Sequence, residues 1–111
     1  MSKSKQKGTS FESHVVDFLK KNGFPNAERR ALTGALDKGD ITGVGSLVFE
    51  CKNHAQLAFS AWLEEAEVER VNADADFGIV VAKRRGRGKA EEQYVVMALG
   101  SFVELLKRSG Y

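Results

Sequence analysis

The stretch of residues 78–82, Gly-Ile-Val-Val-Ala, constrains the fold more than any other feature of the chain. It is far too short to span a bilayer, which requires about 20 apolar residues. A short apolar run without polar alternation is instead typical of a strand that is covered on both faces. Residues 77–83 are therefore predicted to form a buried strand, in a sheet with helices on both sides.

Helical periodicity predicts three helices around this strand. Apolar residues at spacings of three and four indicate the first helix, which begins at Thr9 in a capping box with Glu12. A second capping box, Ser101 with Glu104, opens the last helix over residues 102–108. The middle helix covers residues 58–73 and is expected to bury one apolar face, made of Phe59, Trp62, Leu63, Ala66 and Val71.

Four further strands are predicted, over residues 27–33, 41–44, 47–52 and 94–98. The order of elements is then α-β-β-β-α-β-β-α, and the fold class is α/β, with a mixed central β-sheet flanked by helices. Residues 1–8 are polar and lysine-rich with nothing to bury, so they are predicted to be disordered. Residues 9–111 suffice for a single domain.

Composition and cysteine usage narrow the class of protein. Hydrophobic residues make up 42% and charged residues 29%, an ordinary balance for a soluble globular protein. No apolar stretch follows the charged N-terminus, so it is not a secretory signal, and the single cysteine, Cys51, fits a reducing compartment. We expect a cytoplasmic protein that does not engage a membrane. One cysteine and two distant histidines, His14 and His54, exclude a zinc site.

Two charged residues stand on the otherwise apolar strand predicted at residues 47–52. Side chains alternate across a strand, so Glu50 and Lys52 share one face. A half-buried strand does not turn charges inward unless they pair or coordinate something. Phosphodiester hydrolysis supplies such a reason, because Mg²⁺ prefers carboxylate and carbonyl oxygens. Asp40, Glu50 and the backbone carbonyl of Cys51 could hold the ion, while Lys52 orients the attacking water or contacts the phosphate.

A shared metal site requires Asp40 and Glu50 on the same face of the hairpin. A two-residue loop would pair Asp40 with Cys51 and turn its side chain away from Glu50. A three-residue loop over residues 44–46, or a bulge, places Asp40 opposite Glu50. We predict the odd loop or the bulge.

These residues resemble the PD-(D/E)xK nuclease superfamily. Gly39-Asp40-Ile41 stands at the family's P-D or G-D position, and Glu50-Cys51-Lys52 is similar to its E-x-K motif. Phe49 before the motif and Asn53 after it resemble the pattern of archaeal-type Holliday junction resolvases. The resemblance implies a restriction-endonuclease-like core and a catalytic set of Asp40, Glu50 and Lys52.

The resemblance extends over residues 7–90. Residues 7–12 are similar to the K-G-x-x-x-E start of the resolvases' first helix, whose glutamate joins the metal site, and this implies a catalytic and metal-binding role for Glu12. Phage-encoded resolvases continue with a strand and a K-R-R-G loop, as residues 80–86 do. The implied activity is Mg²⁺-dependent cleavage of four-way DNA junctions, with Mn²⁺ as a substitute, by a homodimer.

Basic segments are the candidates for DNA contact. Arginines fork onto phosphate oxygens, and intervening glycines let a loop follow a curved backbone. A solvated turn and a charge-guarded edge strand are the alternative interpretations of these segments. The candidate DNA-binding residues are Arg29, Arg30, Lys83, Arg84, Arg85, Arg87 and Lys89.

Several assignments stay open. Asp37 competes with Asp40, which we prefer because the apolar strand begins directly after it, and Glu12 is also explained by its capping box. Trp62 belongs to the core or to a dimer seam, since residues 62–71 and the final strand are candidates for the interface. The functional alternatives are a nuclease of the same superfamily with another DNA substrate and a non-catalytic DNA-binding domain of the same fold.

Overall fold

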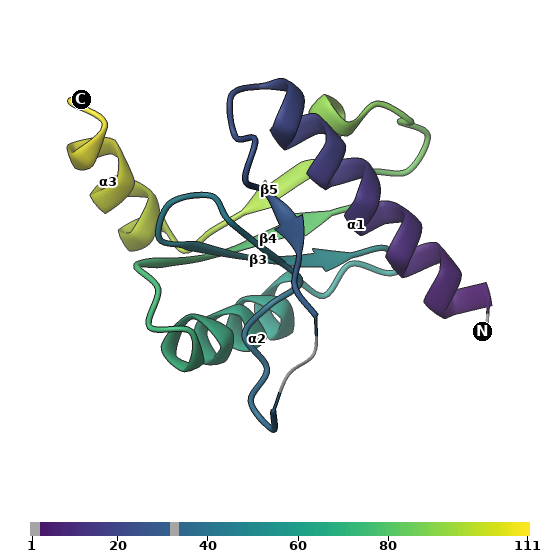
Figure 1. The fold of residues 1–111 in the computed structure, drawn as a ribbon, viewed down its shortest axis with the longest axis horizontal. Coiled ribbons are helices and arrows are strands. Elements are labelled where there is room, and N and C mark those ends of the chain that lie inside the picture. Colours follow the sequence, from purple (N-terminus) through teal and green to yellow (C-terminus); the bar gives the residue numbers. More distant parts are fainter. Residues whose placement is uncertain (1–2, 32–33) are drawn as a thin grey trace.

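The computed structural model describes residues 3–31 and 34–111, which form a sheet and the helices around it (Figure 1). In chain order the elements are α1 (Lys3–Lys21), β1 (Glu28–Arg29), β2 (Ile41–Thr42), β3 (Leu47–Lys52), α2 (Phe59–Asn72), β4 (Phe77–Ala82), the short 3₁₀ helix η1 (Ala90–Glu92), β5 (Tyr94–Val96) and α3 (Leu99–Arg108). Apart from η1, this order confirms the α-β-β-β-α-β-β-α arrangement predicted from the sequence.

The strands form one mixed sheet in the order β1-β2-β3-β4-β5. β3 and β4 run parallel, and the other neighbouring strands are antiparallel. The α/β class with a mixed sheet is thus confirmed, as is the buried strand at β4. β1 is shorter than predicted, and residues 32–33 of the predicted strand lie outside the described residues.

α1 and α2 cover opposite faces of the sheet, while α3 lies beyond one end of it (Figure 1). The core beneath α1 consists of Phe11, Val15, Val16, Ala27, Ile41, Val44, Phe49, Ile79 and Val81. The core beneath α2 consists of Trp62, Ala66, Val80 and Ala82. Because side chains alternate along β3, Phe49 faces α1 whereas Glu50 and Lys52 face α2.

α2 approaches β4 so closely that only glycine fits at position 78. A Cβ atom on Gly78 would lie 2.6 Å from the backbone oxygen of Ala66, well inside van der Waals contact. This approach sets the distance between the helix and the sheet. It therefore also sets how near the acidic side chains of α2 come to β3.

Both predicted capping boxes are wrong. α1 begins at Lys3, so Thr9 and Glu12 lie inside the helix rather than at its start. Residues 3–8 are helical instead of disordered, because Lys and Gln are good helix formers that extend a helix without a buried partner. α3 begins after the N-cap residue Ala98, which makes no side-chain capping bond, and Ser101 lies within the helix. None of the described helices is long and apolar enough to span a membrane.

The buried face of α2 differs from the predicted one at a single turn. Trp62 and Ala66 are buried as expected, but Val71 is 60% exposed and Glu69 is only 2% exposed. Glu69 follows Ala66 by three positions and Trp62 by seven, so helical geometry places it on the same stripe. The structure thus puts a carboxyl group where the sequence suggested valine.

Candidate metal centre

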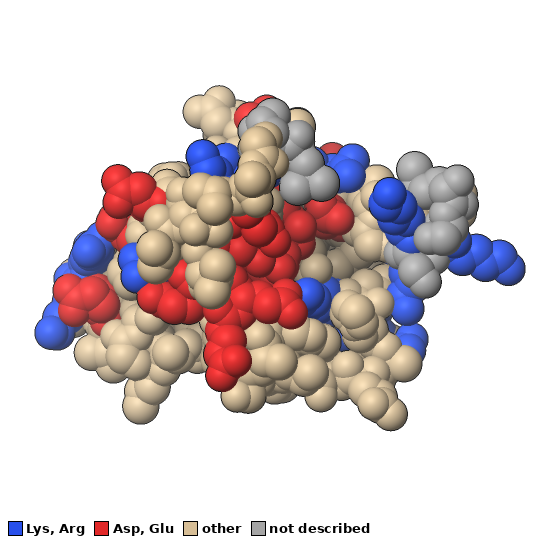
Figure 2. All heavy atoms as spheres, turned by 90° about the horizontal axis from the view of Figure 1, so that it is seen from below, with Lys and Arg blue, Asp and Glu red and all other residues tan. Residues whose placement is uncertain are grey.

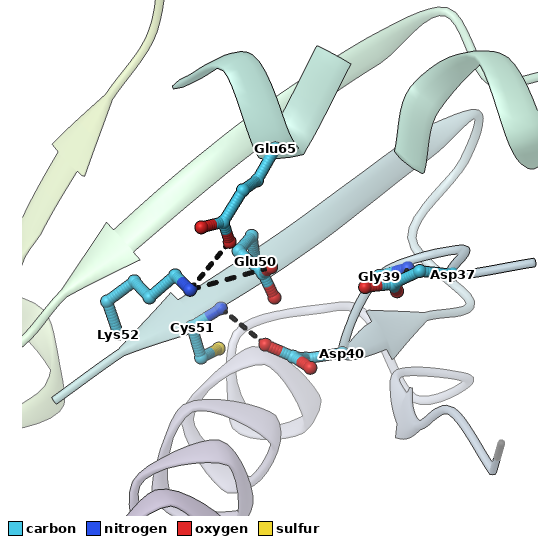
Figure 3. A network of polar contacts seen from close by, with 7 residues as sticks. All are labelled: Asp37, Gly39, Asp40, Glu50, Cys51, Lys52 and Glu65. Carbon is cyan, nitrogen blue, oxygen red and sulfur yellow. Dashed lines mark hydrogen bonds and ion pairs between the residues drawn. The ribbon is translucent and has the colours of Figure 1, made fainter. Parts of the chain in front are cut away.

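The β2–β3 hairpin has the predicted odd register. Ile41 is the partner of Phe49, so Asp40, directly before β2, stands opposite Glu50. Two hydrogen bonds hold Asp40 against β3. Its backbone N–H donates to Phe49 O at 2.8 Å, and its Oδ2 accepts a bond from the Cys51 N–H at 2.8 Å. The two carboxyl groups predicted to share a metal ion are therefore on neighbouring positions of one hairpin (Figure 3).

Lys52 lies between carboxylates of two elements. Its Nζ donates a hydrogen bond to Oε2 of Glu65, on α2, at 2.7 Å and lies 3.9 Å from Oε2 of Glu50 (Figure 3). Glu65 was not among the predicted site residues. It reaches Lys52 because β3 turns this lysine toward α2.

The protonation state of Lys52 follows from these neighbours. Burial acts to lower the pKa of Lys52, but the hydrogen bond to Glu65 and the charges of Glu50 and Asp40 outweigh it, so the pKa is raised. Lys52 is therefore an ammonium group at neutral pH. It can donate to a water molecule or a phosphate oxygen, and it is not a general base in this state.

A second acidic residue of α2 also enters the site. Carboxylate oxygens of Glu69, Glu50 and Asp37 all lie within 4.8 Å of one another. The role of Asp37 was left open by the sequence, and Glu69 was not among the predicted site residues. The signal for Glu69 was its position on the Trp62–Ala66 stripe.

Burial and crowding raise the pKa values of these carboxyl groups. The pKa of Glu50 rises to about 12, because its side chain is buried and because the carboxyl groups of Asp40 and Glu69 adjoin it. The pKa of Glu69 rises to about 7, first through burial and then through the charges of Asp37, Asp40 and Glu65, although the adjoining carboxyl of Glu50 acts in the opposite direction. Carboxyl groups this close cannot all ionise unless a cation neutralises them.

Glu12 joins the site from α1. It lines a cavity of about 520 Å³ together with Arg29, Asp37 and Asp40. Burial raises the pKa of Glu12, as does the charge of Asp40, while the ion pair with Arg29 at 3.8 Å lowers it. Since the capping explanation for Glu12 is wrong, its place beside Asp40 favours the interpretation as a site residue.

The two arginines of the first strand segment border the same cavity. Arg30 donates from Nη2 to the Thr42 hydroxyl at 3.0 Å, and its backbone N–H donates to Asp40 O at 2.8 Å. Its buried Nε has no hydrogen-bond partner within the described residues. Guanidinium groups beside carboxylates can hold the phosphate of a substrate next to a carboxylate-bound cation.

Hydrogen bonds from the side chains of Lys83 and Gln93 hold the basic loop over residues 83–89 in place. The Gln93 side chain accepts from the Arg84 N–H at 2.7 Å and donates to the carbonyl oxygens of Arg87 and Lys89. The Lys83 ammonium donates to the carbonyls of Arg84 and Arg87, so it supports the loop. Arg85, Arg87 and Lys89 are exposed. The loop starts beside Lys52, because the Lys83 N–H donates to Lys52 O at 2.8 Å.

Acidic side chains form a continuous area on the face seen from below, with basic side chains around it (Figure 2). A polyanion is repelled from such a surface unless cations neutralise it. The donors present are carboxylate oxygens, which suit hard cations such as Mg²⁺ or Mn²⁺. Cys51 does not change this chemistry, because burial and the nearby carboxylates raise the pKa of its thiol and keep it neutral. Its carbonyl remains the predicted third oxygen ligand.

Comparison with protein-family models, with curated proteins and with solved structures finds no match to this chain.

Proposed function

We propose that this chain is a metal-dependent endonuclease that hydrolyses DNA phosphodiester bonds with Mg²⁺, or Mn²⁺ as a substitute, on a PD-(D/E)xK core. The observation that carries the proposal is the hairpin register, which brings Asp40 opposite Glu50 with Lys52 on the face of Glu50. The resemblance of residues 39–41 and 50–52 to the family motif adds support. Two acids that can hold an ion beside an ammonium group that can donate to water or phosphate suit metal-assisted hydrolysis.

The residues divide the chemistry between them. Asp40, Glu50 and the Cys51 carbonyl would hold the ion, and Glu12 would contribute from α1. A bound divalent ion lowers the pKa of a coordinated water and neutralises charge on the scissile phosphate. Lys52, which Glu65 holds at 2.7 Å as an ammonium, donates to the attacking water or to a phosphate oxygen.

DNA is positioned by the basic segments at the margin of the acidic area. The loop over residues 83–89 begins next to Lys52, and Arg29 and Arg30 line a cavity together with Asp40. A phosphate backbone that crosses the site would therefore meet two cationic segments. Exposed Arg85, Arg87 and Lys89 supply most of this contact, since Lys83 is engaged inside the loop.

The proposed substrate is a four-way DNA junction, cut by a homodimer, as in the resolvases that the chain resembles. A two-fold symmetric protein presents two active sites, and symmetric junctions require two cuts. The exposed apolar residues of β5 and α3, Val95, Leu99, Phe102 and Val103, offer a surface for a second copy.

A gel assay on junction, flap and duplex DNA, with and without Mg²⁺, tests the proposal. Lys52→Ala is expected to reduce junction cleavage by about 100-fold or more, because the transition state loses a preorganised cation. Junction affinity should change little, since the basic segments provide most of the binding. Lys20→Ala, which removes an exposed lysine at the end of α1, is the matched control and should cleave like the wild type.

The possible outcomes separate the alternatives. Cleavage of duplex or flap DNA in preference to the junction would keep the nuclease and change its substrate. Metal-independent binding without cleavage of any of the three would indicate a DNA-binding domain. Full activity of Lys52→Ala would refute the assigned chemistry.

A further inference from the structure

We infer that Glu69, Asp37 and Glu50 form a second divalent-cation site beside the one at Asp40, with Glu50 shared between the two. The inference rests on the proposed function for its role, because a second ion would act on the same phosphate. The expected ligand is a hard dication such as Mg²⁺ or Mn²⁺, held by carboxylate oxygens.

Glu69 is the observation that points to a ligand. Its side chain is 2% exposed, and its Oε2 has no hydrogen-bond partner among the described residues. A carboxylate oxygen that is removed from water and left unpaired is costly, unless a proton or a cation binds there. A Cβ atom on Gly39 would lie 3.4 Å from this oxygen, so Oε2 is directed at the loop that carries Asp37 and Asp40.

Asp37 is fixed opposite Glu69 by the same helix. The side chain of Asn72, on α2, donates to the backbone oxygen of Asp37 at 2.8 Å. Asp37 Oδ1 accepts a bond from the Gly39 N–H at 2.9 Å, which closes a tight turn. The carboxyl groups of Asp37, Glu69 and Glu50 therefore face one another because of backbone-level contacts.

Gly39 allows this close approach. Its φ of +94° is a conformation that side-chain-bearing residues rarely adopt. A Cβ atom there would also lie 3.3 Å from Phe49 O and from the Val48 Cβ, so a side chain would press the loop away from β3. The glycine of the G-D motif thus serves the Asp37–Glu69 side of the site as well as the Asp40 side.

Glu50 separates the two proposed ion positions. Asp40 is turned toward the Cys51 N–H, with its Oδ2 bonded at 2.8 Å, whereas Asp37 and Glu69 meet Glu50 within 4.8 Å. Asp37, Glu69 and Glu50 would hold the second ion, which would neutralise further charge on the phosphate.

The test counts ions on the full chain without DNA. Mn²⁺ binding is measured by electron paramagnetic resonance of the free ion, and Mg²⁺ binding by calorimetry, both at neutral pH and up to millimolar ion. Wild-type protein is expected to bind two ions per chain. Glu69→Gln, which keeps the shape of the side chain, is expected to weaken one of them by about tenfold or more.

Two further variants make the count decisive. Glu64→Gln removes one negative charge from an exposed position of the same helix and should still bind two ions. Asp37→Asn alters an exposed loop residue and should weaken the same ion as Glu69→Gln, so it replaces that variant if the latter fails to fold. One ion per wild-type chain, or unchanged binding in the folded variants, overturns the inference.

Failure of this inference and failure of the proposed function are distinguishable. A chain that cleaves DNA but binds a single ion, unaffected at Glu69, keeps the nuclease and loses the second site. A chain that binds two ions and loses one in Glu69→Gln, yet cleaves no DNA, keeps the second site and loses the nuclease.

Discussion

At Glu50, the arrangement of the candidate site conflicts most directly with the stability of the fold. It is 6% exposed, and its carboxyl is adjacent to those of Asp40 and Glu69. The lysine 3.9 Å away is already bonded to Glu65. Without a cation, the fold must keep protons on these groups to limit repulsion. This cluster of like charges therefore lowers the folding stability, a cost that is common at functional sites.

The stability of the metal-free protein is expected to fall as pH rises from about 5 to 8. The folded pKa of Glu69 is about 7, above the ordinary 4.5 of an unfolded chain. Its stabilising contribution is therefore complete below 4.5 and is lost as the pH passes through 7. The pKa of Glu50, raised to about 12, acts in the same direction over a wider range.

Thermal melts of the metal-free protein check this dependence. Glu69→Gln should be more stable than wild type at pH 8 by about 1–3 kcal/mol and should differ little at pH 4. Added Mg²⁺ should raise the melting temperature of wild type at pH 8 and raise that of the variant less. Glu64→Gln, exposed on the same helix, should follow wild type at every pH. A wild-type protein that is as stable at pH 8 as at pH 5 would contradict the argument.

The sequence predicts the part of the site that is local in the chain. Alternation along one strand placed Glu50 and Lys52 together, and loop parity placed Asp40 opposite Glu50. Glu65 and Glu69 depend instead on how α2 docks on the sheet, which no local pattern contains. Hydropathy favoured Val71 for the buried face, but the helix turns Glu69 inward instead. A charged residue gives no sign in the sequence that it is buried.

At the scale of elements, the docking of α2 on β4 controls the site. Hydrophobic patterning predicts the five strands and their order along the chain. It also predicts where two of the helices lie. Both capping-box predictions were wrong, because the same residue pattern also occurs inside helices, as it does at Thr9 and Ser101. The depth of helix packing was not predictable, since it depends on which backbone atoms oppose Gly78.

Gly78→Ala is expected to destabilise the protein by about 1–3 kcal/mol. The new Cβ would lie 2.6 Å from the Ala66 backbone oxygen, so α2 must move away from β4. Because α2 carries Glu65 and Glu69, cleavage and metal affinity should fall together with stability. Urea denaturation and ion binding measure the two effects.

Gly88→Ala provides the control for this substitution. A Cβ atom at Gly88 would meet nothing within 4 Å, so stability should stay within about 0.5 kcal/mol of wild type. Gly78→Ala with wild-type stability would show that the helix–sheet distance is not fixed at this contact.

At the scale of the whole molecule, an apolar surface on β5 and α3 is left uncovered by the other described residues. None of the residues of α3 is buried, although the helix presents Leu99 at 76% and Phe102 at 45% exposure. With Val95 of the edge strand β5, at 63%, they border a cavity of about 520 Å³. Trp62 and Ala66 are core residues, so the dimer seam predicted on α2 would have to use its other side.

The β5–α3 surface is expected to join two copies of the chain. An isologous interface buries the same patch twice, which suits a sheet edge flanked by an amphipathic helix. Phe102→Glu places a charge in that patch and should yield a monomer in light scattering at micromolar concentration. The matched variant Val68→Glu, at a 58% exposed position of α2, should remain a dimer.

The Phe102→Glu monomer should nick a junction in one strand without making the paired second cut, because each site would then act alone. A wild-type monomer, or a Phe102→Glu variant that stays dimeric, would place the interface elsewhere or remove it.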